Sequence, residues 1–122
     1  MKQIWIVDDD EEMTQAVGLM LQLLNCEVRS FFNARAAAQT LLAGGKPDML
    51  LLDINMPEVT GLDLLEFLRR RPEWRKLPAV MLSSEAADVM IDRAMDLGAN
   101  GYLIKPIVIE ELEHIMNDVF RN

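Results

Sequence analysis

The sequence alternates five times between a short apolar run and a longer segment with helical periodicity, and few folds accept such a pattern. Parallel strands need helical crossovers that bury both faces of the sheet, so their sequences read as uninterrupted apolar runs. The pattern therefore predicts an α/β fold: a (βα)5 three-layer sandwich around a five-stranded parallel sheet. The strands are expected at residues 4–7, 28–32, 49–52, 79–82 and 101–104, and the helices at residues 11–24, 34–43, 62–70, 86–97 and 109–120.

Length and charge limit the classes of function. A chain of 122 residues is about one domain, so we expect a single domain over residues 1–122. No apolar run approaches the ~20 residues of a membrane span. Twelve basic and twenty acidic residues give a net charge of −8, which argues against direct binding of nucleic acid. The single cysteine, Cys26, excludes an internal disulfide and fits a reducing compartment, so we expect a cytoplasmic protein.

Polar side chains follow four of the five apolar runs. Asp8 and Asp9 come after the first run, Asp53 after the third, Ser83 after the fourth and Lys105 after the fifth. Open α/β sheets bind their ligands at the carboxyl ends of the strands, near the point where the strand order reverses. We therefore expect these five side chains to meet in one cleft.

The charges of that cleft point to a metal ion and a phosphoryl group. Three carboxylates and one ammonium leave a net charge of −2, which a divalent cation would cancel. Oxygen ligands without imidazole or thiolate select Mg²⁺ or Mn²⁺, and Mg²⁺ commonly shares its coordination shell with a phosphate. Asp53 stands alone after the central strand and is the candidate nucleophile, which would form an aspartyl phosphate. Ser83 and Lys105 could each contact one phosphoryl oxygen.

Each of these residues also has an explanation without a site. The acidic run at residues 8–12 could cap a helix, Asp53 could form a turn, Ser83 could precede a helix as its cap, and Lys105 could be a surface lysine. Their joint occurrence at the ends of the expected strands, with charges that balance around a divalent ion, favours one shared site.

Four motifs resemble the receiver domain of two-component response regulators, the CheY-like family, and the resemblance covers residues 3–120. The motifs are Ile-Val-Asp-Asp-Asp at 6–10, Leu-Leu-Asp-Ile-Asn-Met-Pro at 51–57 with Gly61, Leu-Ser-Ser-Glu at 82–85, and the run at 98–106 that ends in Lys105-Pro106. The resemblance implies a flavodoxin-like fold with strand order 2-1-3-4-5. It also implies a phosphorylation-dependent signalling switch.

The resemblance implies a role for each acidic residue. Asp53 would be the phosphoacceptor, and Asp9 and Asp53 would bind Mg²⁺ through their carboxylates. Asp8 would act through a water molecule, and Asn55 through its backbone carbonyl.

The same resemblance implies how the signal leaves the site. Ser83 would move to the phosphoryl group, Lys105 would pair with it, and Tyr102 would swing from solvent toward the space that Ser83 vacates. Asn55 and Glu85 occupy positions that tune the lifetime of the phosphoryl group. The Lys105-Pro106 bond is expected to be cis.

The partners implied are a sensor histidine kinase or a phosphotransfer protein upstream, and a downstream protein or output domain that contacts residues 86–120. The chain would act as a monomer or a phosphorylation-dependent dimer. It would phosphorylate and dephosphorylate only itself, so we do not expect an enzyme with an external substrate.

Two other classes of protein match part of this pattern. A haloacid dehalogenase-type phosphatase needs an Asp-x-Asp after the first strand, which Asp8 and Asp10 supply, but it also needs a Thr or Val where Glu12 stands and room for a cap. A flavodoxin needs a phosphate-binding loop of Ser, Thr and Gly after the first strand, where this chain has an acidic run.

Overall fold

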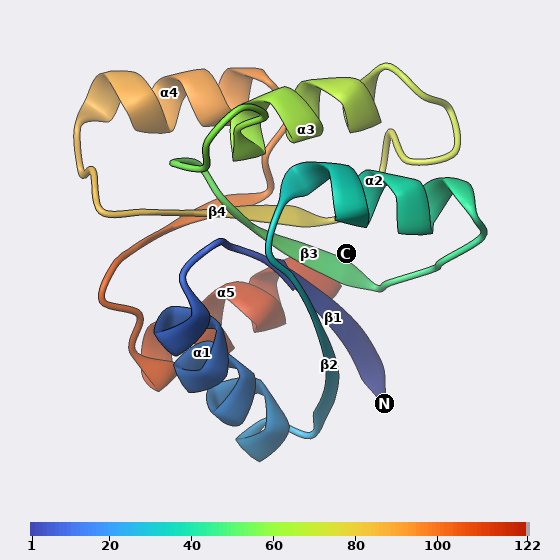
Figure 1. The fold of residues 1–122 in the computed structure, drawn as a ribbon. Helices are drawn as coiled ribbons and strands as arrows, with labels where there is room; N and C mark the ends of the chain where they lie inside the picture. Colours follow the sequence, from blue (N-terminus) through green and yellow to red (C-terminus); the bar gives the residue numbers. More distant parts are fainter. Residues whose placement is uncertain (122) are drawn as a thin grey trace.

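The computed structural model describes residues 1–121, which form one parallel sheet with helices on both of its faces (Figure 1). In chain order the elements are β1 (Lys2–Val7), α1 (Glu11–Leu23), β2 (Cys26–Phe31), α2 (Ala34–Leu42), β3 (Met49–Asp53), α3 (Gly61–Arg69), β4 (Ala79–Ser83), α4 (Asp88–Asp96), β5 (Gly101–Ile104) and α5 (Ile109–Arg121). The strand order is β2-β1-β3-β4-β5, and every neighbouring pair is parallel. The predicted fold class and strand order are confirmed.

Alternate residues of the central strands supply two separate hydrophobic cores. On one face, Trp5, Leu50 and Met81 belong to a cluster with α2, α3 and α4. On the other face, Ile4 and Leu51 belong to a cluster with α1 and α5. Figure 1 shows this division, with α1 and α5 below the sheet and the other three helices above it. Because successive side chains of a strand point to opposite faces, an uninterrupted apolar run fills both cores at once.

The helices begin where local chemistry satisfies their first backbone N–H groups. Asp10 caps α1 by accepting a hydrogen bond from Met13 N, and Asn33 caps α2 by accepting one from Ala36 N. At α3, Thr60 and Asp63 form a capping box, in which each side chain accepts from the backbone of the other. Helix α4 has no side-chain cap.

Several helices and strands begin or end one or two residues away from the positions predicted from the sequence. Strand β2 starts at Cys26, two residues before the predicted start, and α4 starts at Asp88, two residues after it. Strand β2 lies at the sheet edge and is half exposed, so its start has no continuous apolar run to mark it. Within residues 1–121, no helix has both the length and the apolar character that crossing a bilayer requires.

Candidate functional site

The carboxyl end of β1 delivers a buried carboxylate to the sheet edge. Asp8 follows the last residue of the strand, its backbone N–H donates to Phe31 O over 3.0 Å, and its side chain is fully buried. Asp8 Oδ1 accepts a hydrogen bond from the backbone N–H of Asp10 at 2.9 Å. The residue that caps α1 therefore also orients the Asp8 carboxylate.

Asp9 and Asp53 complete an acidic cluster with Asp8. One carboxylate oxygen from each of the three residues lies within 4.8 Å of the others. Asp53 is the last residue of β3 and is 2% exposed, whereas Asp9 faces solvent. The backbone N–H of Asn55 donates to Asp53 Oδ1 at 3.3 Å, and the Asn55 side chain is exposed. The expectation that two separate segments bring three carboxylates together is met in the structure.

Lys105 brings a positive charge to the same cleft from the end of β5. Its ammonium Nζ lies 3.1 Å from Asp8 Oδ2 and 3.2 Å from Asp53 Oδ1, and its side chain is 22% exposed. The backbone N–H of Lys105 donates to Ser83 O at 2.8 Å, which fixes the base of the lysine against β4. The Lys105–Pro106 peptide bond is cis, as the resemblance implied.

These contacts move the pKa values of the central pair. Burial raises the pKa of Asp53, and the negative charge of Asp8 raises it further, while Lys105 acts in the opposite direction. Burial by itself would lower the pKa of Lys105, but its contacts with Asp8 and Asp53 outweigh that effect and raise it. The pair therefore binds protons more tightly than either group does in water.

The residues of the cleft fit a hard divalent cation. Asp8 Oδ2 is buried and lacks a hydrogen-bond donor among the residues that the structure describes, because its contact with Lys105 is an ion pair without hydrogen-bond geometry. Three carboxylates and one lysine leave a charge of −2, and the donor set is all oxygen. Asp8, Asp9 and Asp53 therefore form an acidic cluster that could hold a metal ion.

Ser83, Glu85 and Tyr102 form a chain of hydrogen bonds beside the acidic cluster. Ser83 is fully buried at the end of β4, and its Oγ accepts from the backbone N–H of Glu85 at 3.0 Å. The Tyr102 hydroxyl donates to the backbone carbonyl of Glu85 at 3.0 Å. The loop between β4 and α4 thus joins the buried hydroxyl to the aromatic residue of β5.

Tyr102 lies on β5 beside the β4–α4 loop. Its ring is half-buried and packs against the core cluster that includes α4. The carbonyl of Glu85 supplies an acceptor for the hydroxyl, so the amphipathic ring has both apolar contact and a polar partner. The Glu85 side chain is exposed, and its contribution to this arrangement is made by its backbone.

The two loops that border the cleft are held very differently. The β3–α3 loop ends in the capping box of Thr60 and Asp63, and a Cβ atom on Gly61 would collide with the backbone carbonyl of Asp53. The β4–α4 loop, in contrast, is exposed from residue 84 to residue 87 and leads into α4 at Ala87, without a side-chain cap. Of the two borders, the β4–α4 loop has fewer contacts to lose.

The family model of the response regulator receiver domain matches residues 4–117. The chain belongs to this family. A receiver domain is the phosphorylation-dependent switch of two-component signalling, and all five polar residues expected at the strand ends lie within the matched range.

Individual relatives agree with that membership. This receiver is 32% identical to the chemotaxis protein CheY of Pseudomonas aeruginosa, over 97% of this chain and 95% of that protein. It is 31% identical to protein RcaC of Microchaete diplosiphon, over 90% of this chain but only 17% of RcaC. The chain therefore spans nearly the whole of one relative and a small part of another. The solved structure of Vibrio cholerae CheY4 superposes with a TM-score of 0.89 at 28% identity, covering 98% of each chain.

Two features around the site escaped sequence analysis. The sequence places Asp10 in an acidic run that could cap a helix, and the structure adds that its backbone N–H donates to the Asp8 carboxylate. Gly61 belonged to a motif, but nothing in the sequence said that it packs against the Asp53 backbone. The contact between Asp8 and Asp10 is a local Asx turn over two residues, whereas the Gly61 contact depends on how the loop folds back onto β3.

Proposed function

We propose that Asp53 is the phosphoacceptor of this receiver domain. The supporting observation is the convergence of three carboxylates and one ammonium at the end of β3, with the Asp53 carboxylate in contact with Lys105 and within 4.8 Å of both other acids. Asp8 has the same lysine and the same acids around it, so the choice of Asp53 rests on its place at the end of the central strand β3.

In the proposed reaction a carboxylate oxygen of Asp53 forms a bond to the phosphorus of a phosphohistidine, while the P–N bond breaks and the electron pair leaves with the imidazole. The phosphoryl group adds negative charge beside a carboxylate, so its oxygens need positive or donating partners. Lys105 supplies an ammonium at the required place, and the Ser83 hydroxyl supplies a donor once it turns away from Glu85 N.

We further propose that the acidic cluster holds Mg²⁺, with Mn²⁺ as a substitute. Asp9 and Asp53 would bind it through their carboxylates, Asp8 through a water molecule, and Asn55 through its backbone carbonyl. Asp8 Oδ2 is buried without a hydrogen bond among the described residues and shares its one ion-pair partner, Lys105, with Asp53, which supports an additional electropositive partner in the cleft. When bound, the ion would neutralise charge on the phosphoryl oxygens.

We infer that the signal leaves through the β4–α4 loop. Movement of Ser83 toward the phosphoryl group would break its hydrogen bond from Glu85 N, and Glu85 O is the acceptor for Tyr102. The uncapped α4 lies directly after that loop, so the surface of residues 86–120 would change its shape. Asn55 and Glu85 border the cleft from two loops, which fits a role in the lifetime of the phosphoryl group.

The proposed upstream partner is a sensor histidine kinase or a phosphotransfer protein, and the proposed downstream partner is a protein or output domain that contacts residues 86–120. We propose that residues 1–122 form one receiver domain, which acts in the cytoplasm as a monomer or as a phosphorylation-dependent dimer. It would catalyse only its own phosphorylation and dephosphorylation, with no direct contact to nucleic acid.

Intact mass spectrometry after incubation with acetyl phosphate and Mg²⁺ tests the assignment. We expect the wild type to gain the mass of one phosphoryl group, Asp53→Asn to gain none, and the exposed control Asp118→Asn to behave as the wild type. Gain of mass by Asp53→Asn with loss of it in Asp8→Asn would instead support the phosphatase-like alternative.

A further inference from the structure

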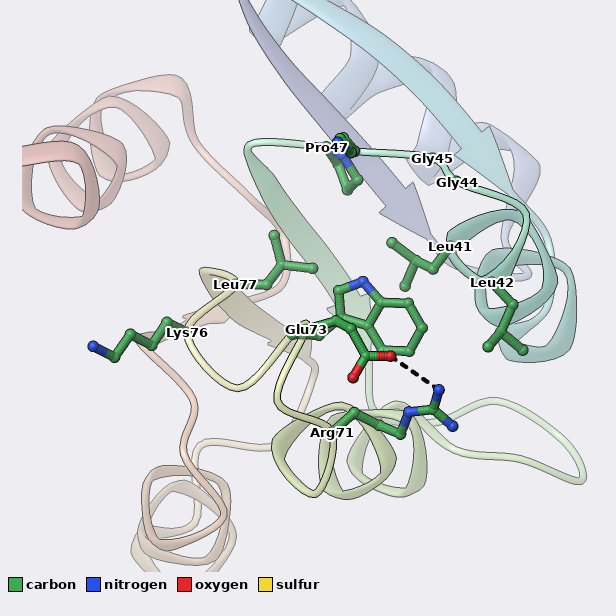
Figure 2. A pocket seen from close by; sticks show the side chains of 11 residues that line it. Leu41, Leu42, Gly44, Gly45, Pro47, Arg71, Glu73, Lys76 and Leu77 are labelled. Atoms are coloured by element: carbon green, nitrogen blue, oxygen red, sulfur yellow. Dashed lines mark hydrogen bonds and ion pairs between the residues drawn. The ribbon is translucent and has the colours of Figure 1, made fainter.

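A pocket of about 560 Å³ lies at the amino ends of strands β3 and β4, on the side of the sheet away from the acidic cleft at their carboxyl ends. It is enclosed by the α2–β3 loop and the α3–β4 loop, which precede the two strands whose far ends carry Asp53 and Ser83 (Figure 2). A strand of five residues is about 16 Å long, so a ligand here would not touch the phosphoryl cleft. The apolar part of its lining consists of Leu41, Leu42, Pro47, Trp74 and Leu77.

The charged part of the lining has the opposite sign to the molecule. Lys46, Arg71 and Lys76 supply three cations and Glu73 one carboxylate, in a chain with a net charge of −8. In Figure 2 Lys76 extends away from the leucine side chains, while Arg71 pairs with Glu73. Apolar walls with a basic rim therefore interrupt an acidic surface.

The aromatic wall of the pocket is held in place before any ligand arrives. Arg69 donates from Nη1 to Trp74 O at 2.9 Å, from Nε to Gly98 O at 3.0 Å, and from Nη2 to Asn100 Oδ1 at 3.1 Å. The Arg71 guanidinium lies 5.3 Å from the centroid of the Trp74 ring. A preformed wall loses little conformational freedom on binding, which favours its use as a binding surface.

A simpler reading is that these cations only offset the negative carboxyl ends of α2 and α3. Arg71 does not fit it, because its guanidinium pairs with Glu73 over 3.0 Å and lies against aromatic rings. Lys46 and Lys76 are exposed and take part in no ion pair within residues 1–121. Leu42, which ends α2, is 56% exposed at the pocket, and a helix-dipole role gives no reason for that exposure.

We propose that this pocket binds an acidic peptide segment of a partner protein, which inserts one large apolar side chain between Leu41, Trp74 and Leu77. Lys46 and Lys76 come from the two different loops that border the pocket, so a ligand that meets both must carry acidic groups on either side of an apolar centre. A peptide has that form. Rim charges would steer it and set its orientation, while the apolar side chain would supply most of the affinity.

Selection from a random peptide display library against the immobilised wild-type chain tests this without knowledge of the partner. We expect enriched peptides in which Asp or Glu flanks one Leu, Phe or Trp. Their dissociation constants, measured by fluorescence anisotropy, should rise at least tenfold in Trp74→Ala and in the double variant Lys46→Glu/Lys76→Glu. Raised salt should weaken binding to the wild type.

The double variant alters only exposed side chains, so it tests the proposal even if Trp74→Ala fails to fold. Its matched control is Arg35→Glu/Arg93→Glu, which changes the net charge equally at exposed sites outside the pocket and should bind as the wild type. Enrichment of no acidic motif, or equal weakening in both double variants, would overturn the proposal. So would a wild-type dimer in sedimentation that Lys46→Glu/Lys76→Glu dissolves, since the occupant would then be a second copy of this chain.

Discussion

The Lys105 ammonium lies 3.2 Å from Asp53 Oδ1 and compensates a carboxylate that is only 2% exposed. The same ammonium lies 3.1 Å from the fully buried Asp8. Two carboxylates thus share one cation, and the cleft keeps an excess of negative charge that no protein group among the described residues removes. The energetics of the metal-free protein follow from that imbalance.

Replacement of Lys105 by Met should destabilise the metal-free protein, because Asp8 and Asp53 would lose their shared counter-charge. Removing one partner of a fully buried pair costs about 3–5 kcal/mol, and the partial exposure of Lys105 reduces our expectation to about 2 kcal/mol. Urea unfolding in EDTA measures the loss. The exposed Lys76→Met is the control, and an equal effect of both changes would contradict the role of the ion pair.

Replacement of Asp53 by Asn should have the opposite effect and stabilise the metal-free protein. Burial, and then the charge of Asp8, raise the pKa of Asp53, so the folded state holds this proton more tightly than the unfolded state does. The wild type then keeps its stability below the ordinary Asp pKa of about 3.9 and loses it as the pH rises through the raised value. In EDTA, the melting temperature of Asp53→Asn should exceed that of the wild type at pH 7, and this difference should become smaller at acidic pH. A difference in melting temperature that becomes larger at acidic pH would contradict the raised pKa of Asp53.

Mg²⁺ should stabilise the wild type and do so much less in Asp9→Asn. A ligand at 100 times its dissociation constant adds about 2.7 kcal/mol to the free energy of unfolding. Asp9 is exposed, so its loss should weaken binding without harm to the fold. Isothermal titration calorimetry with MgCl₂ checks the affinity, with the exposed Glu12→Gln as control. Unchanged affinity in Asp9→Asn would remove that residue from the proposed ligand set.

Replacement of Tyr102 by Phe should loosen the β4–α4 loop selectively. The change removes the hydrogen bond to Glu85 O, worth about 0.5–1.5 kcal/mol, and keeps the ring that packs on the core. Hydrogen exchange followed by mass spectrometry should show faster exchange in peptides that contain residues 84–90 and no change in β1. Unaltered exchange in that loop would mean that the hydroxyl does not hold it.

Adjacent arginines at the end of α3 should differ sharply in their effect on stability. Arg69 donates three hydrogen bonds to the α3–β4 and α4–β5 loops, and burial lowers its pKa. Arg70 has only a 3.6 Å ion pair with Glu66 at an exposed site. Arg69→Met should cost about 2 kcal/mol because it leaves two part-buried carbonyls without donors, and Arg70→Met less than about 0.5 kcal/mol. Equal losses in urea unfolding would contradict the contact pattern.

The architecture was predictable because the central strands are buried on both faces. Met49–Asp53 and Ala79–Ser83 are entirely buried, so their sequences carry unbroken apolar runs that end where the chain reaches the cleft. The polar residue after each run then had to lie at one edge of the sheet, which located Asp8, Asp53 and Ser83 before any coordinates. Position along the chain was enough, since strand ends in a parallel sheet are neighbours.

Contacts made by long side chains and loops were not predictable in the same way. Arg69 lies in a run of three arginines, and nothing in that run distinguishes the one that bonds to two loops from its neighbours. The hydrogen bond of the Tyr102 hydroxyl depends on a carbonyl at Glu85 that only the folded loop presents. Such contacts form only when distant loops come together in the folded chain, so they produce no periodic pattern in the sequence.

The absence of a side chain at Gly61 has a mechanical consequence. The β3–α3 loop rests directly on the peptide unit of Asp53, and the capping box fixes the next turn of helix. Strand β3 and helix α3 are therefore held together by direct backbone packing. We expect a displacement that starts at Asp53 to be taken up by the β4–α4 loop instead, because no side chain caps the first turn of α4 at Ala87.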